Sequence, residues 1–383
     1  MHLPPELLLE ILELCDLATL IPCAAACRLF RCHILTPAFL QRRRAAARGS
    51  FTHSSLVGVF YRHCEREARP RPPLFTTIPP GPAAAVAESP FPLVPDVFRD
   101  YTPVESRDGL LVLRSIDYYA VKHAGLCVYD PVTGRRAFLP PPEVYDLSYA
   151  LRRVGDDDDG SSWFRLTAVD LRMGPMIQAQ SFSPADGSWG PVIEAPNPRL
   201  CRPVVRLSPV ILSDVAHWLC GDNRSVLTFH LDTMQLGRIE IPGRQHWHTF
   251  WTGQEQQLLA SSPDGELSMI FGDRLVISIW VLTPGAGWTQ RKRVDMGRIL
   301  PAMMEPGLPF RRHRQLYFEW FGERSGAVLA QVAGLGFFAV NLQTEEVCTV
   351  GERSRDIAAF RYCPYEVDHI ARLEAMQSSG VAC

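Results

Sequence analysis

The fold is decided by a stretch that reads Val128-Tyr129-Asp130-Pro131-Val132-Thr133-Gly134, in which an apolar strand stops at a turn of Asp, Pro, Thr and Gly. The same order of strand, turn and second strand recurs at 182–187, 229–234, 281–285 and 340–344. The turn positions 131, 184, 232, 284 and 343 are separated by steps of 53, 48, 52 and 59 residues. A strand-rich period of about 50 residues indicates propeller blades, because helical solenoid repeats are shorter.

Further strand candidates lie around these turns, at 56–61, 109–113, 210–212, 258–261, 275–280 and 336–340. Three or four strands for each turn fit one blade, so we expect an all-β domain folded as a β-propeller of five or six blades. The period is kelch-like in length, although the Gly-Gly and Trp-Asp doublets of kelch and WD40 repeats are absent. A pair of β-sandwiches is the alternative, because strand periodicity does not distinguish radial from layered packing.

The first 48 residues differ from the rest, since apolar residues recur there at helical spacing and Gly is absent before Gly49. One apolar stripe, at 7–12, follows two prolines, and Asp16 is placed to cap a second helix. Four short helices make a marginal core by themselves, so this unit is expected to need a partner surface. The sequence therefore predicts a helical domain at 1–48, a β-domain at 49–365, and a C-terminal helix and tail at 366–383. An amphipathic segment at 365–373 marks that last helix, which we expect on the outside of the β-domain.

The helical unit carries a motif that runs Leu3-Pro4-Pro5-Glu6-Leu7-Leu8-Leu9-Glu10-Ile11-Leu12, followed by Ala26-Cys27-Arg28-Leu29-Phe30. This pattern resembles the F-box, with Phe30 where that family usually has Trp. The resemblance implies that the helices dock as one apolar face on a helical adaptor of the SKP type. The adaptor-binding residues that it implies are Leu3, Pro4, Leu7, Leu8, Ile11, Leu12, Leu20, Cys27 and Phe30.

The β-domain resembles the propeller-like associated domains of plant F-box proteins through 126–136, 139–142 and 363–367. Together the two resemblances imply a substrate-recognition subunit of an SCF-type ubiquitin ligase. Its expected partners are the SKP-type adaptor, a cullin scaffold reached through that adaptor, and a target protein that the motifs do not identify. The alternative is a propeller enzyme or a sugar-binding module whose N-terminus is merely structural.

Residues with the chemistry of an active site are few. The chain contains no G-x-S-x-G, no H-E-x-x-H and no P-loop, so we expect no catalytic residues and no cofactor. Cys23, Cys27 and the nearby Cys32 could together suggest a zinc site, but Cys23 and Cys27 share a helix face with the apolar stripe, where thiols pack as small hydrophobes, and no metal is expected. The acidic run at 156–159 lacks the spaced acids of a calcium loop. Trp247 and Trp251 are the candidates for substrate binding, since aromatic side chains contribute much of the binding energy at protein interfaces. Alternatively, they lie on a strand whose two faces are both packed within the domain.

Composition limits the partners and the compartment. The formal net charge is −2, which argues against general binding to nucleic acid or membranes. We interpret the basic run at 42–44 as the solvated end of a helix. Eleven cysteines without a Cys-x-x-Cys pair indicate reduced thiols, so the expected location is the cytoplasm, the nucleus or both.

Lysine is almost absent from this chain. Of 39 Lys plus Arg residues only Lys122 and Lys292 are lysines. Arginine keeps the positive charge but does not accept ubiquitin, so the internal acceptors for self-modification are limited to these two side chains.

Overall fold

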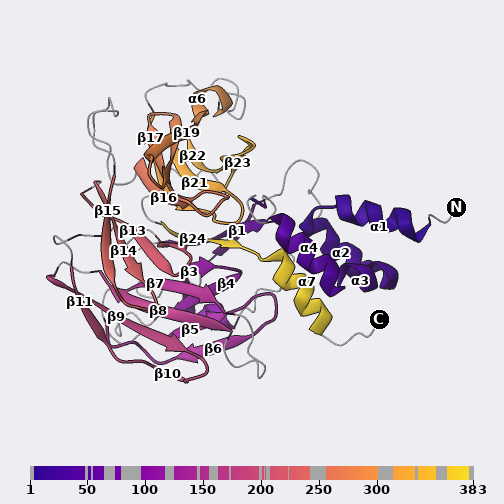
Figure 1. The fold of residues 1–383 in the computed structure, drawn as a ribbon, viewed down its shortest axis with the longest axis horizontal. Coiled ribbons are helices and arrows are strands. Elements are labelled where there is room, and N and C mark those ends of the chain that lie inside the picture. Colours follow the sequence, from indigo (N-terminus) through magenta and orange to yellow (C-terminus); the bar gives the residue numbers. More distant parts are fainter. Residues whose placement is uncertain are drawn as a thin grey trace.

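The computed structural model describes residues 4–47, 51–52, 55–63, 74–78, 96–116, 125–144, 147–154, 163–171, 174–197, 201, 203, 208–222, 224–241, 256–300, 314–332, 335–350 and 360–378. A helical unit lies at one end of the molecule and a ring of β-sheets forms the rest (Figure 1). Among the described residues, no helix is both long and apolar enough to cross a membrane.

Five consecutive antiparallel sheets form the five blades of a β-propeller, which confirms the predicted fold class. Blade 1 consists of β3 (Tyr101–Arg107), β4 (Leu110–Ser115), β5 (Leu126–Tyr129) and β6 (Arg136–Leu139). Blade 2 consists of β7 (Leu147–Arg153), β8 (Phe164–Asp170), β9 (Met176–Ser183), β10 (Ser188–Trp189) and β11 (Ile193–Pro196). Blade 3 consists of β12 (Val210–Leu212), β13 (Val215–Leu219), β14 (Ser225–His230) and β15 (Leu236–Glu240). Blade 4 consists of β16 (Gln257–Ser261), β17 (Leu267–Asp273), β18 (Val276–Thr283) and β19 (Gly287–Asp295), with the short helix α6 (Met296–Ile299) after it. Blade 5 consists of β20 (Leu316–Phe321), β21 (Ala327–Val332), β22 (Gly336–Asn341) and β23 (Val347–Thr349).

A three-stranded sheet completes the ring between blades 5 and 1. It pairs β1 (Leu56–His63) with both β2 (Leu74–Thr77) and β24 (Phe360–Glu366), so the start and the end of the β-domain share one sheet. Its two faces are buried differently: Val59 packs with Leu329 of blade 5, whereas Phe60 packs with Leu113 of blade 1. The short helix α5 (Val97–Asp100) adds Phe98 to the second of these clusters. Apolar clusters of the same kind fill the spaces between successive blades, so the core of the domain is divided around the ring.

In blades 1, 3 and 5 the side chain at the start of the recurring turn holds the turn in shape. The Asp130 carboxylate accepts hydrogen bonds from the N–H groups two and three residues later, at 2.9 and 3.3 Å. His230 and Asn341 accept the same two bonds in blades 3 and 5. The residue four positions on has a positive φ in each turn, 73° at Gly134, 58° at Met234 and 63° at Glu345. These local bonds explain why the turn is visible as a repeat in the sequence.

The helical unit contains α1 (Pro5–Leu14), α2 (Leu17–Ala26), α3 (Arg28–Ile34) and α4 (Pro37–Ala47). The Asp16 side chain accepts a hydrogen bond from the Thr19 N–H at 2.6 Å, as expected for the cap of α2. Its core contains Leu12, Leu17, Leu20, Ile21, Ala24, Ile34, Leu35, Phe39 and Leu40.

The C-terminal helix α7 (His369–Ser378) completes this core instead of lying on the outside of the β-domain. Residues 365 and 366 still belong to β24, so the helix begins three residues after that strand ends. Ile370 and Leu373 of α7 then pack among the side chains of α2 and α4, beside which α7 lies in Figure 1. We therefore propose that the helical domain comprises 1–48 together with α7.

This arrangement predicts that Leu373→Ala destabilises the helical unit by about 2–5 kcal/mol, because it leaves a cavity at a fully buried position. Urea unfolding followed by the helical circular dichroism signal measures the change. Glu374→Ala is the matched control, since the ion pair of Glu374 with Arg44, at 2.6 Å, lies at the surface. Equal, small effects of the two substitutions would contradict a shared core.

Candidate functional site

One candidate site is an exposed apolar face on α1. Leu7, Ile11 and Leu14 are spaced by four and three residues, so they lie on the same side of this helix. Their exposed fractions are 44%, 47% and 88%, and Leu29 of α3 is 45% exposed. Elsewhere in the described part of the chain, only Phe138 and Met176 are large hydrophobic residues that are exposed. Apolar surface gathered in this way marks a site for interaction with another protein. We call the surface formed by Leu7, Ile11 and Leu14 the α1 face.

The other residues of the F-box motif have different positions. Leu12 and Leu20 are buried in the core of the helical unit, while Leu8 and Cys27 are half-buried. Phe30 packs against the edge of that core, and Pro4 is exposed at the start of α1. Leu3 lies outside the described residues. The predicted adaptor-binding set omits Leu14 and Leu29, although Leu29 lies within the quoted motif and a further step of seven residues from Leu7 points to Leu14.

The basic run at 42–44 lies in the second half of α4, where Arg42 and Arg44 are exposed to solvent, and its side chains also contact neighbouring helices. Arg42 pairs with Glu13 at 2.7 Å, and Arg44 pairs with Glu374 of α7 at 2.6 Å. Arg43 donates to the carbonyl oxygens of Glu13 and Cys15 at the end of α1, where the helix dipole favours a cation. These charges therefore hold the helices together.

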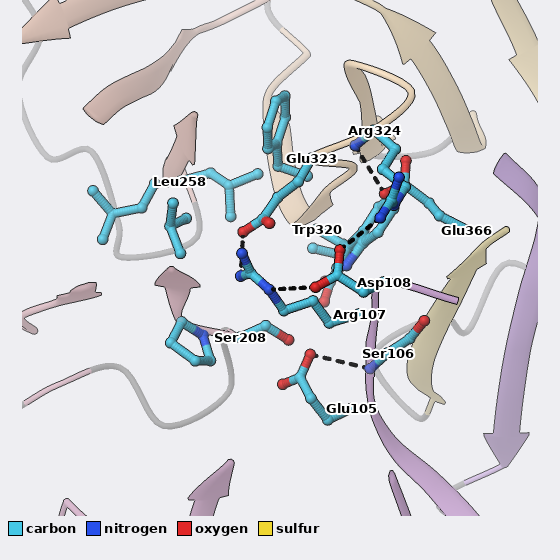
Figure 2. Close-up of a pocket in the computed structure, with 15 residues that line it drawn as sticks. Glu105, Ser106, Arg107, Asp108, Ser208, Leu258, Trp320, Glu323, Arg324 and Glu366 are labelled. Atoms are coloured by element: carbon cyan, nitrogen blue, oxygen red, sulfur yellow. Dashed lines mark hydrogen bonds and ion pairs between the residues drawn. The ribbon is translucent and has the colours of Figure 1, made fainter. Parts of the chain in front are cut away.

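The second candidate site is a small central cavity of about 40 Å³ (Figure 2). Its lining combines residues from β3 and the turn after it with residues from β20, β24 and blade 4. Arg107 pairs with Glu323 at 2.8 Å and also donates to the carbonyl of Ile211 at 2.7 Å. The Glu105 side chain accepts from the Ser106 N–H at 3.1 Å.

Arg324 connects this cavity to the helical unit. Its guanidinium pairs with Asp108 at 2.8 Å and with Asp368, which precedes α7, at 2.9 Å. The Glu366 carboxylate accepts from the backbone N–H groups of Arg324 and Ser325 at 3.1 and 2.7 Å. The Arg324 carbonyl in turn accepts from the Thr52 N–H at 2.7 Å. Arg324 of blade 5 thus contacts blade 1, the residue before α7 and the segment that follows the four N-terminal helices.

Three acids that line the cavity, Glu105, Glu323 and Asp108, have pKa values that differ from their ordinary values. Burial raises the pKa of Glu105 to about 8, and the Ser208 hydroxyl only partly offsets it. Burial likewise raises the pKa of Glu323 to about 7 despite its contact with Arg107. Burial also opposes ionisation of Asp108, but Arg107 and Arg324 outweigh it and hold the pKa of this carboxyl below its ordinary value.

The cavity has room for little more than a water molecule, and small-molecule pockets are typically about 300–1,000 Å³. No group of three or more His, Cys, Asp or Glu residues could hold a metal ion in the described part of the chain. The sequence candidates Trp247 and Trp251, and the acidic run at 156–159, lie outside the described residues.

The central network of ion pairs was not predicted, because it joins residues that are more than 200 positions apart, as Asp108 and Arg324 are.

The raised pKa of Glu105 predicts a stability that depends on pH. The folded chain keeps this carboxyl protonated above its ordinary pKa of 4.5, whereas the unfolded chain ionises it there. The folded chain therefore loses stability as the pH rises from 4.5 to about 8. Glu105→Gln, which stays neutral, should reduce that loss by on the order of a few kcal/mol.

Chemical denaturation of the variant at several pH values checks this result. Glu143→Gln, at an exposed position, should follow the wild-type profile. Coincident profiles for Glu105→Gln and wild type would show that Glu105 is ionised in the folded chain.

Both parts of the chain match models of protein families. A family model described as F-box-like matches residues 1–45, so the chain has an F-box-like domain at its N-terminus. A model described as a domain of unknown function, DUF7595, matches residues 84–379. No match is found among curated proteins.

Solved structures with a similar arrangement are distant. A Lactobacillus plantarum protein has 11% identity and a TM-score of 0.37, over 78% of this chain and 82% of its own. The periplasmic gluconolactonase of Pseudomonas aeruginosa has 13% identity and a TM-score of 0.38, over 79% of this chain and 84% of its own. The family match covers most of the β-propeller and extends through α7. The chain belongs to the DUF7595 family.

Proposed function

We propose that this protein is the substrate-recognition subunit of an SCF-type ubiquitin ligase. The F-box-like domain binds an SKP-type adaptor, a cullin scaffold joins through that adaptor, and the β-propeller binds the target protein. The observation that carries this proposal is the exposed α1 face on a domain that matches the F-box-like family. An apolar helix face of this kind docks into the groove of a helical partner.

The attachment of the helical unit to the propeller supports the same role. Ile370 and Leu373 bury α7 in the helical core, while Arg324 pairs with Asp368 at the start of that helix. Phe51 packs against Phe321 of blade 5 with ring centroids 6.0 Å apart, which adds an apolar contact to the same junction. A target held by the propeller would therefore keep a fixed position relative to the adaptor. Ubiquitin transfer benefits from such an arrangement, because proximity and orientation raise the effective concentration of the reacting groups.

The central cavity favours a receptor over a propeller enzyme or sugar-binding module. Two ion pairs, Arg107 with Glu323 and Arg324 with Asp108, occupy the space where a ligand would enter. The volume that is left, about 40 Å³, is too small for a sugar. The nine cysteines of the described residues form no disulfide bonds, which fits the reducing environment of the cytoplasm or nucleus, where we place the protein.

Adaptor binding is expected to depend on the α1 face. Leu7→Ser with Ile11→Ser should weaken the complex with a purified SKP-type adaptor at least about a hundredfold, since each buried aliphatic side chain contributes roughly 1.5–3 kcal/mol. Isothermal titration calorimetry measures the dissociation constant. Because both side chains are half-exposed, the helical circular dichroism signal should be retained.

Phe138→Ser is the matched control, as it removes an equally exposed apolar residue, 58% accessible, from blade 1. It should leave adaptor affinity unchanged. Full affinity in the folded double variant would place the adaptor interface elsewhere, and no binding by the wild type would refute the proposed function.

A further inference from the structure

Because lysine is almost absent, the position of each lysine determines where ubiquitin can be attached to this chain under the proposed function. A ubiquitin ligase modifies amines that come within reach of its conjugating enzyme, and its receptor subunit is itself within that assembly. This chain offers only Lys122 and Lys292 as internal acceptors. Lys122 lies outside the described residues, whereas the surroundings of Lys292 are defined.

Lys292 links two blades of the propeller. It lies on β19, the outer strand of blade 4, where it pairs with Ile279. Its ammonium group reaches across to the turn between β22 and β23 of blade 5. There it donates to the Gln343 carbonyl at 2.9 Å and pairs with the Glu345 carboxylate at 3.2 Å. The side chain is 33% exposed, so it is neither free in solution nor sealed in the core.

The turn that receives Lys292 has a fixed shape. The Asn341 side chain accepts from the N–H groups of Gln343 and Thr344 at 2.8 and 2.9 Å, and Glu345 has a φ of 63°. Local hydrogen bonds therefore hold the turn backbone, including the Gln343 carbonyl that accepts from Lys292, independently of Lys292. An ammonium group with preorganised partners loses them both when it moves away.

Ubiquitin transfer would require that loss. The ammonium first gives a proton to solvent, and the neutral Nζ then attacks the thioester carbonyl at the ubiquitin C-terminus. An isopeptide C–N bond forms, the C–S bond to the conjugating enzyme's cysteine breaks, and the second proton ends on the released thiolate. Acylation removes the charge that pairs with Glu345 and places a bulky group between the two blades.

We propose that Lys292 is a structural tie between blades 4 and 5 that is withheld from ubiquitin transfer, so that self-modification of lysines in the receptor falls on Lys122. The consequence for Lys122 rests on the proposed function. The protection of Lys292 rests only on its two contacts, and it can be measured without the ligase.

The first experiment measures amine reactivity in the full chain. N-hydroxysuccinimidyl acetate is added at neutral pH, and mass spectrometry follows acetylation of Lys292 in buffer and in urea. The acetylation rate of Lys292 should be at least about fivefold lower in buffer than in urea, because the folded chain must first lose the hydrogen bond and the ion pair of this side chain. Glu345→Asn should raise the folded rate about two- to fivefold, because Asn tolerates the positive φ but lacks the charge.

Glu346→Asn is the matched control, since its carboxylate accepts from the Thr344 hydroxyl at 3.3 Å instead of from Lys292. It should leave the rate at Lys292 unchanged. Equal rates in buffer and in urea, or no response to Glu345→Asn, would overturn the proposed protection.

The second experiment uses the ligase reconstituted with adaptor, cullin and conjugating enzyme. Lys122→Arg should remove most of the ubiquitin attached to internal lysines. Lys292→Arg, which retains donors for both contacts of Lys292, should leave the amount of attached ubiquitin unchanged. Ubiquitin on Lys292 at a level equal to that on Lys122 would overturn the proposal. If no ubiquitin is transferred to any protein, the proposed function fails, and the acetylation rates still decide whether Lys292 is protected.

Discussion

The pairing of β1 with β24 is the constraint on which the rest of the molecule depends. The two strands are joined in antiparallel register from Leu56 opposite Glu366 to His63 opposite Phe360, although about 300 residues separate them in the chain. Their sheet packs on the apolar faces of blades 1 and 5 that would otherwise be exposed. Forming this contact costs conformational entropy, because the whole β-domain lies in the loop that it closes.

Ring closure also decides where the helical unit sits. Because α7 begins at His369, directly after β24, the position of the closing strand sets the position of this helix. Arg324 then adds charge contacts to Asp108 and Asp368 across the same junction. Partly buried ion pairs contribute little net stability but are costly when one partner is removed. The network therefore favours one arrangement of helices and blades over others, which is what a receptor that presents a target to a bound enzyme requires.

The helical unit shows how one sequence motif serves two tasks. Leu12 and Leu20 build the core, while Leu7 and Ile11 remain at the surface, although all four belong to the same apolar pattern. The motif predicts an amphipathic bundle and a partner, but its spacing does not separate the two sets. Burial of α7 makes that separation, because Ile370 and Leu373 cover one apolar face and leave the α1 face uncovered. The proposed adaptor interface is the apolar surface that this chain does not cover for itself.

The sequence by itself determined what local interactions specify. The turn repeat was visible because Asp130, His230 and Asn341 each accept hydrogen bonds from N–H groups only two and three residues away, so a side chain that can accept such bonds recurs at the same place in these turns. Helix spacing and the Asp16 cap were visible for the same reason. Only the tertiary structure decided that β24 closes the ring, that α7 joins the helical core, that Arg324 meets Asp108, and that Lys292 crosses between blades. These contacts join residues that are about 50 to more than 300 positions apart, and no periodicity in a single sequence encodes such distances.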